Sequence, residues 1–121
     1  SGRVPALANI VTTGLKIKPI LCIEEGVAKM VGIALTRHGS LIEIVKRVVR
    51  DFKKAKWVFI SMSHALSVEE SRKVTKKVQP LLNCVGTIIT DCTPVVGVHT
   101  GPGLIVIAVS SLNQDIAELF I

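Results

Sequence analysis

Aromatic residues are almost absent from this sequence. Its 121 residues include one Trp, three Phe and no Tyr, although 49% of the residues are hydrophobic. A core of this composition consists of Val, Ile and Leu, which favours β-strands that are buried on both faces. The few aromatic residues are also not interleaved with the basic ones, as they are in proteins that stack nucleic-acid bases. The length of the chain predicts a single domain over residues 1–121, and its composition favours buried β-strands and argues against a nucleic-acid partner.

Cysteines are few and show no pairing pattern. Cys22, Cys84 and Cys92 are odd in number and lie within apolar runs. They have neither the spacing of a disulfide framework nor the Cys-x-x-Cys spacing of a metal site. We expect buried, reduced thiols, no metal and no cofactor, and hence a protein of the reducing cytoplasm.

No apolar run is long enough to cross a membrane. Residues Cys92–Asn113 include no Lys, Arg, Asp or Glu, but prolines and glycines interrupt them. Their unbroken apolar part, Leu104–Val109, is far shorter than a transmembrane helix. The start of the chain also lacks the pattern of a signal peptide. We therefore expect no transmembrane segment.

Acidic residues are outnumbered by basic ones, 9 to 15, and the formal net charge is +6. Much of the positive charge falls in Lys46–Lys56 and Arg72–Lys77. Such clusters can bind nucleic acid, anionic lipid or an acidic partner. We interpret them as solvated faces of helices, because no nucleic-acid-binding motif accompanies them.

Hydrophobic periodicity predicts alternating helices and strands. The expected helices are Val4–Thr13, Ser40–Ala55, Ser67–Leu82 and Ser111–Ile121. The expected strands are Leu15–Ile23, Val27–Thr36, Trp57–Ser63, Val85–Thr90 and Leu104–Val109. This order predicts an α/β fold with a mixed β-sheet of about five strands packed with helices.

Local signals refine these boundaries. Glu24-Glu25-Gly26 predicts a hairpin turn, and Pro19 predicts an edge strand or a bulge. The patterns Ser40-x-x-Glu43 and Ser67-x-x-Glu70 predict capping boxes at the starts of two helices. Pro80 is expected to end or kink the second of these helices.

The segment Thr93–Gly103 has the most distinctive composition, with three glycines, two prolines and one histidine. Glycine permits positive φ and proline fixes φ, so this segment needs a particular backbone path. The His99 imidazole and the Thr100 hydroxyl can hold a carboxylate, together with backbone N–H groups at Gly101. With an aliphatic tail among Val, Ile and Leu side chains of the strands, this arrangement describes a fatty-acid site. The simpler alternative is a tight loop with a hydrogen-bonded histidine.

A hydrolase reading of Ser61, Ser63, His64 and Ser67 has little support. No Gly-x-Ser-x-Gly motif surrounds these residues, and no neighbouring carboxylate in the sequence would orient His64. Adjacent residues such as Ser63 and His64 point to opposite faces of a strand. Asp91, the acid nearest the glycine-rich segment, is expected to orient a hydroxyl or N–H group of that segment.

Several ordered motifs resemble the DegV family. His99-Thr100-Gly101-Pro102-Gly103 is similar to its HTGPG motif, and Leu15–Leu21 is similar to its LNIKPIL strand. Gly2-Arg3-Val4, Thr36-Arg37 and Ser61–Ala65 resemble further motifs of that family, and the resemblance extends from Gly2 to about Ser110. Family members are about twice this length, so the chain resembles their C-terminal half, with the N-terminal domain missing.

The resemblance implies a bacterial, non-catalytic protein that binds a long-chain fatty acid such as palmitate, stearate or oleate. His99 would help to hold the carboxylate, and the bound acid would be presented to a fatty acid kinase. Arg37 lies at the basic turn implicated in contact with the kinase, although Leu35-Thr36-Arg37 replaces the family's Arg-Thr-Arg. The alternative is a small-molecule hydrolase or phosphate-handling enzyme that uses the His99 segment, which needs a second titratable partner for His99.

Overall fold

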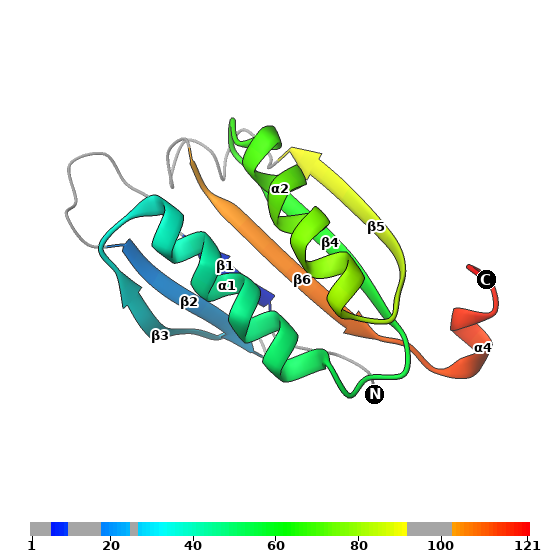
Figure 1. Ribbon diagram of the computed structural model, residues 1–121. Helices are drawn as coiled ribbons and strands as arrows, with labels where there is room; N and C mark the ends of the chain where they lie inside the picture. The colour runs from blue at the N-terminus through cyan, green and yellow to red at the C-terminus, as the bar shows by residue number, and fades with distance from the viewer. Residues whose placement is uncertain (1–5, 10–17, 25–26, 92–102) are drawn as a thin grey trace.

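The computed structural model describes residues 6–9, 18–24, 27–91 and 103–121 (Figure 1). Within these ranges the strands are β1 (Ala6–Asn9), β2 (Lys18–Glu24), β3 (Val27–Ala34), β4 (Val58–His64), β5 (Cys84–Asp91) and β6 (Ile105–Ser111). The helices are α1 (Arg37–Phe52), α2 (Val68–Val78), the 3₁₀ turn η1 (Gln79–Leu81) and α4 (Gln114–Ala117). The predicted α/β fold with a mixed sheet is confirmed, with six strands instead of about five.

The sheet order is β3-β2-β1-β6-β4-β5. Strands β4 and β5 pair in parallel and every other neighbouring pair is antiparallel. Strands β1, β3, β4 and β5 therefore run in one direction, while β2 and β6 run in the other. The four like-directed strands end at Asn9, Ala34, His64 and Asp91, on one side of the sheet that we call the carboxyl end.

Helices α1 and α2 lie side by side on one face of the sheet (Figure 1). Each has a buried stripe at helical spacing, with Ile44, Val48 and Phe52 on α1 and Val74 and Val78 on α2. Strand β4 alternates between buried and half-buried residues, as expected for a strand with one face against helices. Buried aliphatic side chains of these elements and of β6 form the core, each contributing about 1.5–3 kcal/mol when fully buried.

The predicted helix Val4–Thr13 is wrong where the structure describes it. Ala6–Asn9 forms strand β1, which pairs antiparallel with both β2 and β6 near the middle of the sheet. A short apolar segment fits either periodicity, and pairing on both sides satisfies its backbone groups in the strand conformation.

The two expected capping boxes do not form. Helix α1 begins at Arg37, one turn earlier than predicted, and the Thr36 hydroxyl accepts from the Gly39 N–H at 2.9 Å. Ser40 is buried, and its hydroxyl donates to the Arg37 carbonyl at 2.7 Å. Helix α2 follows Ser67 as predicted, but the Ser67 side chain makes no capping hydrogen bond.

The remaining local predictions had mixed outcomes. The β2–β3 hairpin is confirmed, and a register shift between Ile20 and Leu21 follows Pro19 directly. Strand β2 is an interior strand, however, and not an edge. Helix α2 ends at Val78 and continues as a 3₁₀ turn containing Pro80, as expected. The terminal helix is only Gln114–Ala117, and none of the described helices has the length and hydropathy to cross a membrane.

Candidate functional site

The segment that carries His99 starts and finishes at the carboxyl end of the sheet. His99, Thr100 and Gly101 themselves lie outside the described residues, but Asp91 and Gly103 on either side are described. The Gly103 N–H donates to the Ala65 carbonyl at 2.8 Å, and the Ala65 N–H donates to the Leu104 carbonyl at 3.0 Å. These bonds extend the β4–β6 pairing by one step beyond His64 and Ile105 and fix the place where the segment re-enters the sheet.

Gly103 adopts the left-handed conformation that the glycine-rich composition predicted. Its φ is 97°, a region that residues with a Cβ rarely occupy. Its carbonyl oxygen accepts a hydrogen bond from Nη1 of Arg37 at 2.6 Å. The last residue of the His-Thr-Gly-Pro-Gly motif is therefore tied to the first residue of α1.

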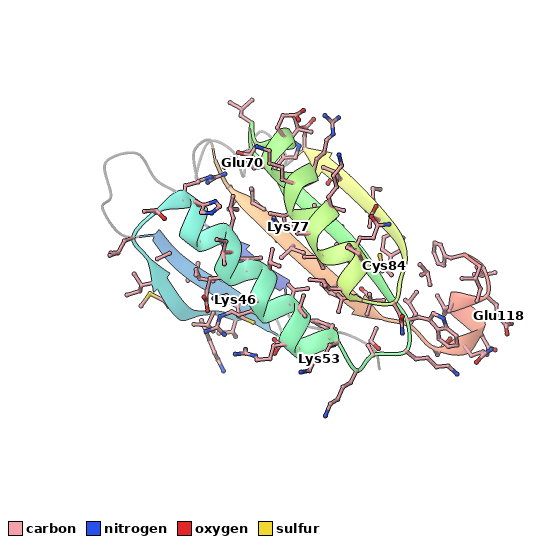
Figure 2. The ribbon with its side chains drawn as sticks, in the orientation of Figure 1. Lys46, Lys53, Glu70, Lys77, Cys84 and Glu118 are labelled. Atoms are coloured by element: carbon pink, nitrogen blue, oxygen red, sulfur yellow. The ribbon has the colours of Figure 1, made fainter. Side chains whose placement is uncertain are left out.

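Arg37 also connects α1 to α2. Its Nε and Nη2 donate to the two carboxylate oxygens of Glu70 at 2.8 and 2.6 Å, and Nη2 lies 3.4 Å from the Ser67 hydroxyl. Glu70 lies in the first turn of α2 (Figure 2). The hydrogen bond from Arg37 is the main reason that the pKa of Glu70 lies below its ordinary value. The sequence suggested a surface turn residue, but Arg37 is half-buried and begins a helix.

A second polar pair lies at the ends of β4 and β5. Nε2 of His64 is 3.3 Å from Oδ1 of Asp91, and Nδ1 accepts from the Ser67 N–H at 3.1 Å. His64 is buried, whereas the Asp91 side chain is 87% exposed. The parallel register of β4 and β5 places His64 beside Asp91, although the two residues are far apart in the sequence. Local sequence patterns therefore could not identify Asp91 as the carboxylate next to His64. Any contact of Asp91 with the segment that follows it lies outside the described residues.

The geometry around His64 does not support a serine nucleophile. Ser63 and His64 point to opposite faces, as predicted, and the Ser63 hydroxyl lies 3.2 Å from that of Thr90. Both ring nitrogens of His64 face other groups, and the Ser67 hydroxyl donates to the Ala65 carbonyl at 3.2 Å. Among the residues that the structure describes, no group of three or more His, Cys, Asp or Glu could hold a metal ion.

An apolar groove of about 360 Å³ lies between α1 and α2. Its floor consists of four aliphatic side chains, namely Leu41, Ile42, Val45 and Val74. Its rims carry His38 and the lysines Lys46, Lys73 and Lys77. His38 of the groove directly follows Arg37, and Figure 2 labels Lys46 on α1 and Lys77 on α2. Because helices line it, this groove is not the strand-lined tunnel that the sequence predicted.

Comparison with known proteins gives matches over most of the chain. A family model described as uncharacterised protein of the DegV family matches residues 1–112. A DegV domain-containing protein of Clostridium acetobutylicum is 31% identical over 107 residues, which are 88% of this chain and 37% of that protein. The chain therefore spans little more than a third of the length of this curated relative.

Solved structures show the same fold. A fatty-acid-binding DegV family protein of Thermus thermophilus superposes with a TM-score of 0.79 at 19% identity, covering 88% of this chain and 45% of that one. A DegV family protein of Ruminococcus gnavus, refined with vaccenic acid, gives a TM-score of 0.76 at 18% identity, covering 87% and 44% of the two chains.

Proposed function

This chain belongs to the DegV family, and on that premise we propose that it forms part of a non-catalytic protein that binds a long-chain fatty acid. Relatives of the same fold are described as fatty-acid-binding or carry vaccenic or heptadecanoic acid. Palmitate, stearate and oleate are ligands of the same class. Because the chain covers less than half of these proteins, the binding site of the whole protein extends beyond the residues present here.

In this proposal His99, Thr100 and Gly101 hold the carboxylate at the carboxyl end of the sheet. The observation that carries the proposal is the anchoring of Gly103 by Arg37 and Ala65, two residues after Gly101. The parallel strands β4 and β5 end here, and in open α/β sheets ligands bind outside the carboxyl ends of parallel strands. Leu66, which is 89% exposed, follows Ala65 at this same end and offers an apolar contact for the acyl chain.

The acyl tail supplies most of the affinity. Each buried CH₂ contributes about 0.8 kcal/mol, so a long chain outweighs the polar contacts at its head. The polar groups then set the position of the carboxylate. We propose that the missing N-terminal domain supplies the rest of the tail site, because relatives are more than twice as long as this chain.

We further propose that the cytoplasmic protein presents the bound acid to a fatty acid kinase. Arg37 remains the proposed contact for the kinase. The side chain of Arg37 is 23% exposed and that of Glu70 is 36% exposed. The kinase would therefore contact the Arg37–Glu70 ion pair and not an isolated positive charge.

Native mass spectrometry of the full-length protein tests the proposal. After purification from a bacterial host, we expect a bound mass that matches a C16–C18 fatty acid. The His99→Ala variant should retain less of this acid, whereas His38→Ala, which changes an exposed histidine of the groove, should retain as much as the wild type. A full-length protein that neither carries a fatty acid nor takes one up when it is added would refute fatty-acid binding.

A further inference from the structure

We infer that the groove between α1 and α2 is a docking site for an acidic amphipathic helix of a protein partner. This site is distinct from the carboxylate site at the His99 segment, and the inference does not depend on fatty-acid binding. It rests on the spacing of the apolar side chains that form the floor of the groove and on the positive charge of the lysines at its rims.

The arrangement of the apolar residues suits a helix. Helices α1 and α2 lie side by side and run in the same direction (Figure 1), and side chains of both helices line the groove. Leu41 and Val45 are one helical turn apart on α1, and Val74 contributes to the same floor from α2. An amphipathic helix presents apolar side chains at the same spacing and lays them into such a groove. Ile42 is 38% exposed, so part of this apolar surface faces solvent.

The charge of the rims selects an acidic partner. Lys46 lies on the α1 side, and Lys73 and Lys77 lie one turn apart on the α2 side. All three are exposed, and none of them takes part in the ion pairs found within the described ranges. Glu70, three residues before Lys73 on α2, is bound by Arg37, and Lys73 adds a smaller contribution to the lowered pKa of Glu70. A helix with acidic residues on both sides of an apolar stripe would complement both rims at once.

Other occupants fit less well. A single anionic amphiphile carries one charge, and its binding would leave most of the rim charge unmatched. A lipid bilayer attracts basic side chains, but its surface does not reach the floor of a channel between two helices. A helix can contact the floor and both rims together, so we propose a helix as the ligand of the groove.

Fluorescence anisotropy with a labelled synthetic peptide tests the inference. The peptide has leucines at helical spacing flanked by glutamates, and a second peptide with glutamines in their place measures the role of charge. We expect the double variant Lys73→Glu/Lys77→Glu to bind the acidic peptide at least about tenfold more weakly. The matched control is Lys53→Glu/Lys54→Glu, which makes the same change in net charge at two exposed lysines outside the groove and should weaken binding less than about twofold.

The outcomes separate the possible occupants. Weakening by Ile42→Ser as well as by the Lys73/Lys77 variant, with the control unaffected, would support a helix in the groove. Equal weakening by both double variants would mean attraction by net charge alone and would overturn the inference. Binding of phosphatidylglycerol vesicles that depends on Lys73 and Lys77, without binding of the peptide, would assign the surface to lipid and would also overturn it.

Discussion

Nη1 of Arg37 donates to the carbonyl oxygen of Gly103 at 2.6 Å, although 66 positions separate the two residues in the chain. The same guanidinium holds both carboxylate oxygens of Glu70. One side chain thus links the start of α1, the first turn of α2 and the end of the glycine-rich segment. The arrangement fixes Gly103, the last residue of the glycine-rich segment, relative to the starts of both helices.

Replacement of Arg37 should destabilise the fold. We expect Arg37→Ala to lower the free energy of unfolding by about 1–2 kcal/mol, because hydrogen bonds of a charged group are lost in a half-buried setting. Urea denaturation measures the change. The matched control is Arg50→Ala, which removes an exposed ion pair with Asp51 and should cost less than about 0.5 kcal/mol. Equal losses in the two variants would show that the links made by Arg37 add nothing to stability.

The Arg37–Glu70 pair should make stability depend on pH. The pKa of Glu70 is lowered in the folded protein, so its ionised form stabilises the fold above the ordinary value of 4.5. This contribution disappears as the pH falls through the lowered pKa. Denaturation between about pH 7 and about pH 3 should therefore show a smaller acid-induced loss in Glu70→Gln than in the wild type. In an Arg37→Ala background, Glu70→Gln should no longer alter the pH dependence, since the main cause of the lowered pKa is gone.

His64 and Asp91 should contribute unequally, although they form one pair. His64→Ala leaves the Ser67 N–H without its acceptor in a buried place, and we expect a loss of about 1–3 kcal/mol. Asp91→Asn changes a side chain that is 87% exposed and should cost less than about 1 kcal/mol. Thermal or urea unfolding of both variants would measure the difference. A larger loss from Asp91→Asn would mean that the contact with Asp91, and not the hydrogen bond from the Ser67 N–H, is the main interaction of His64.

Gly103 should not tolerate a side chain. At φ 97°, Gly103→Ala forces an L-residue into an unfavourable conformation, which we expect to cost about 1–3 kcal/mol. Gly32→Ala is the control, because a Cβ there meets only ordinary contacts, the nearest at 3.7 Å from Arg47. Its effect on the unfolding free energy should be less than about 1 kcal/mol. If the two substitutions lowered the free energy of unfolding by the same amount, the positive φ of Gly103 would impose no extra strain on an alanine at that position.

Much of the fold follows from local patterns in the sequence. The hairpin, the two main helices and the α2 terminus near Pro80 depend on neighbouring residues, which periodicity and turn chemistry describe well. Strand β1 was missed because its four residues are strand-like only through their pairing with β2 and β6. The second capping box failed for a similar reason, since Glu70 is held by Arg37 on another helix instead of its own N-terminus, whereas the first failed because α1 begins earlier, with Thr36 as its cap.

The candidate site was predictable in its motif but not in its supporting contacts. The dense glycines predicted positive φ, and Gly103 shows it. The Arg37–Gly103 and His64–Asp91 contacts join residues that are distant in sequence, and only the sheet order and register bring them together. The assignment of the carboxylate to His99, Thr100 and Gly101 stays a prediction.

The shared direction of β1, β3, β4 and β5 also bears on how proteins of this fold can diversify. The connections that follow these strands all leave from the carboxyl end of the sheet, whereas the aliphatic core lies beneath α1 and α2. The described core draws its side chains from other segments, so under our proposal substitutions between residues 91 and 103 would change what is recognised without replacing residues of that core. A protein engineer could replace residues 92–102 as a unit and keep Arg37 and Ala65, which form hydrogen bonds with Gly103 at the end of that connection.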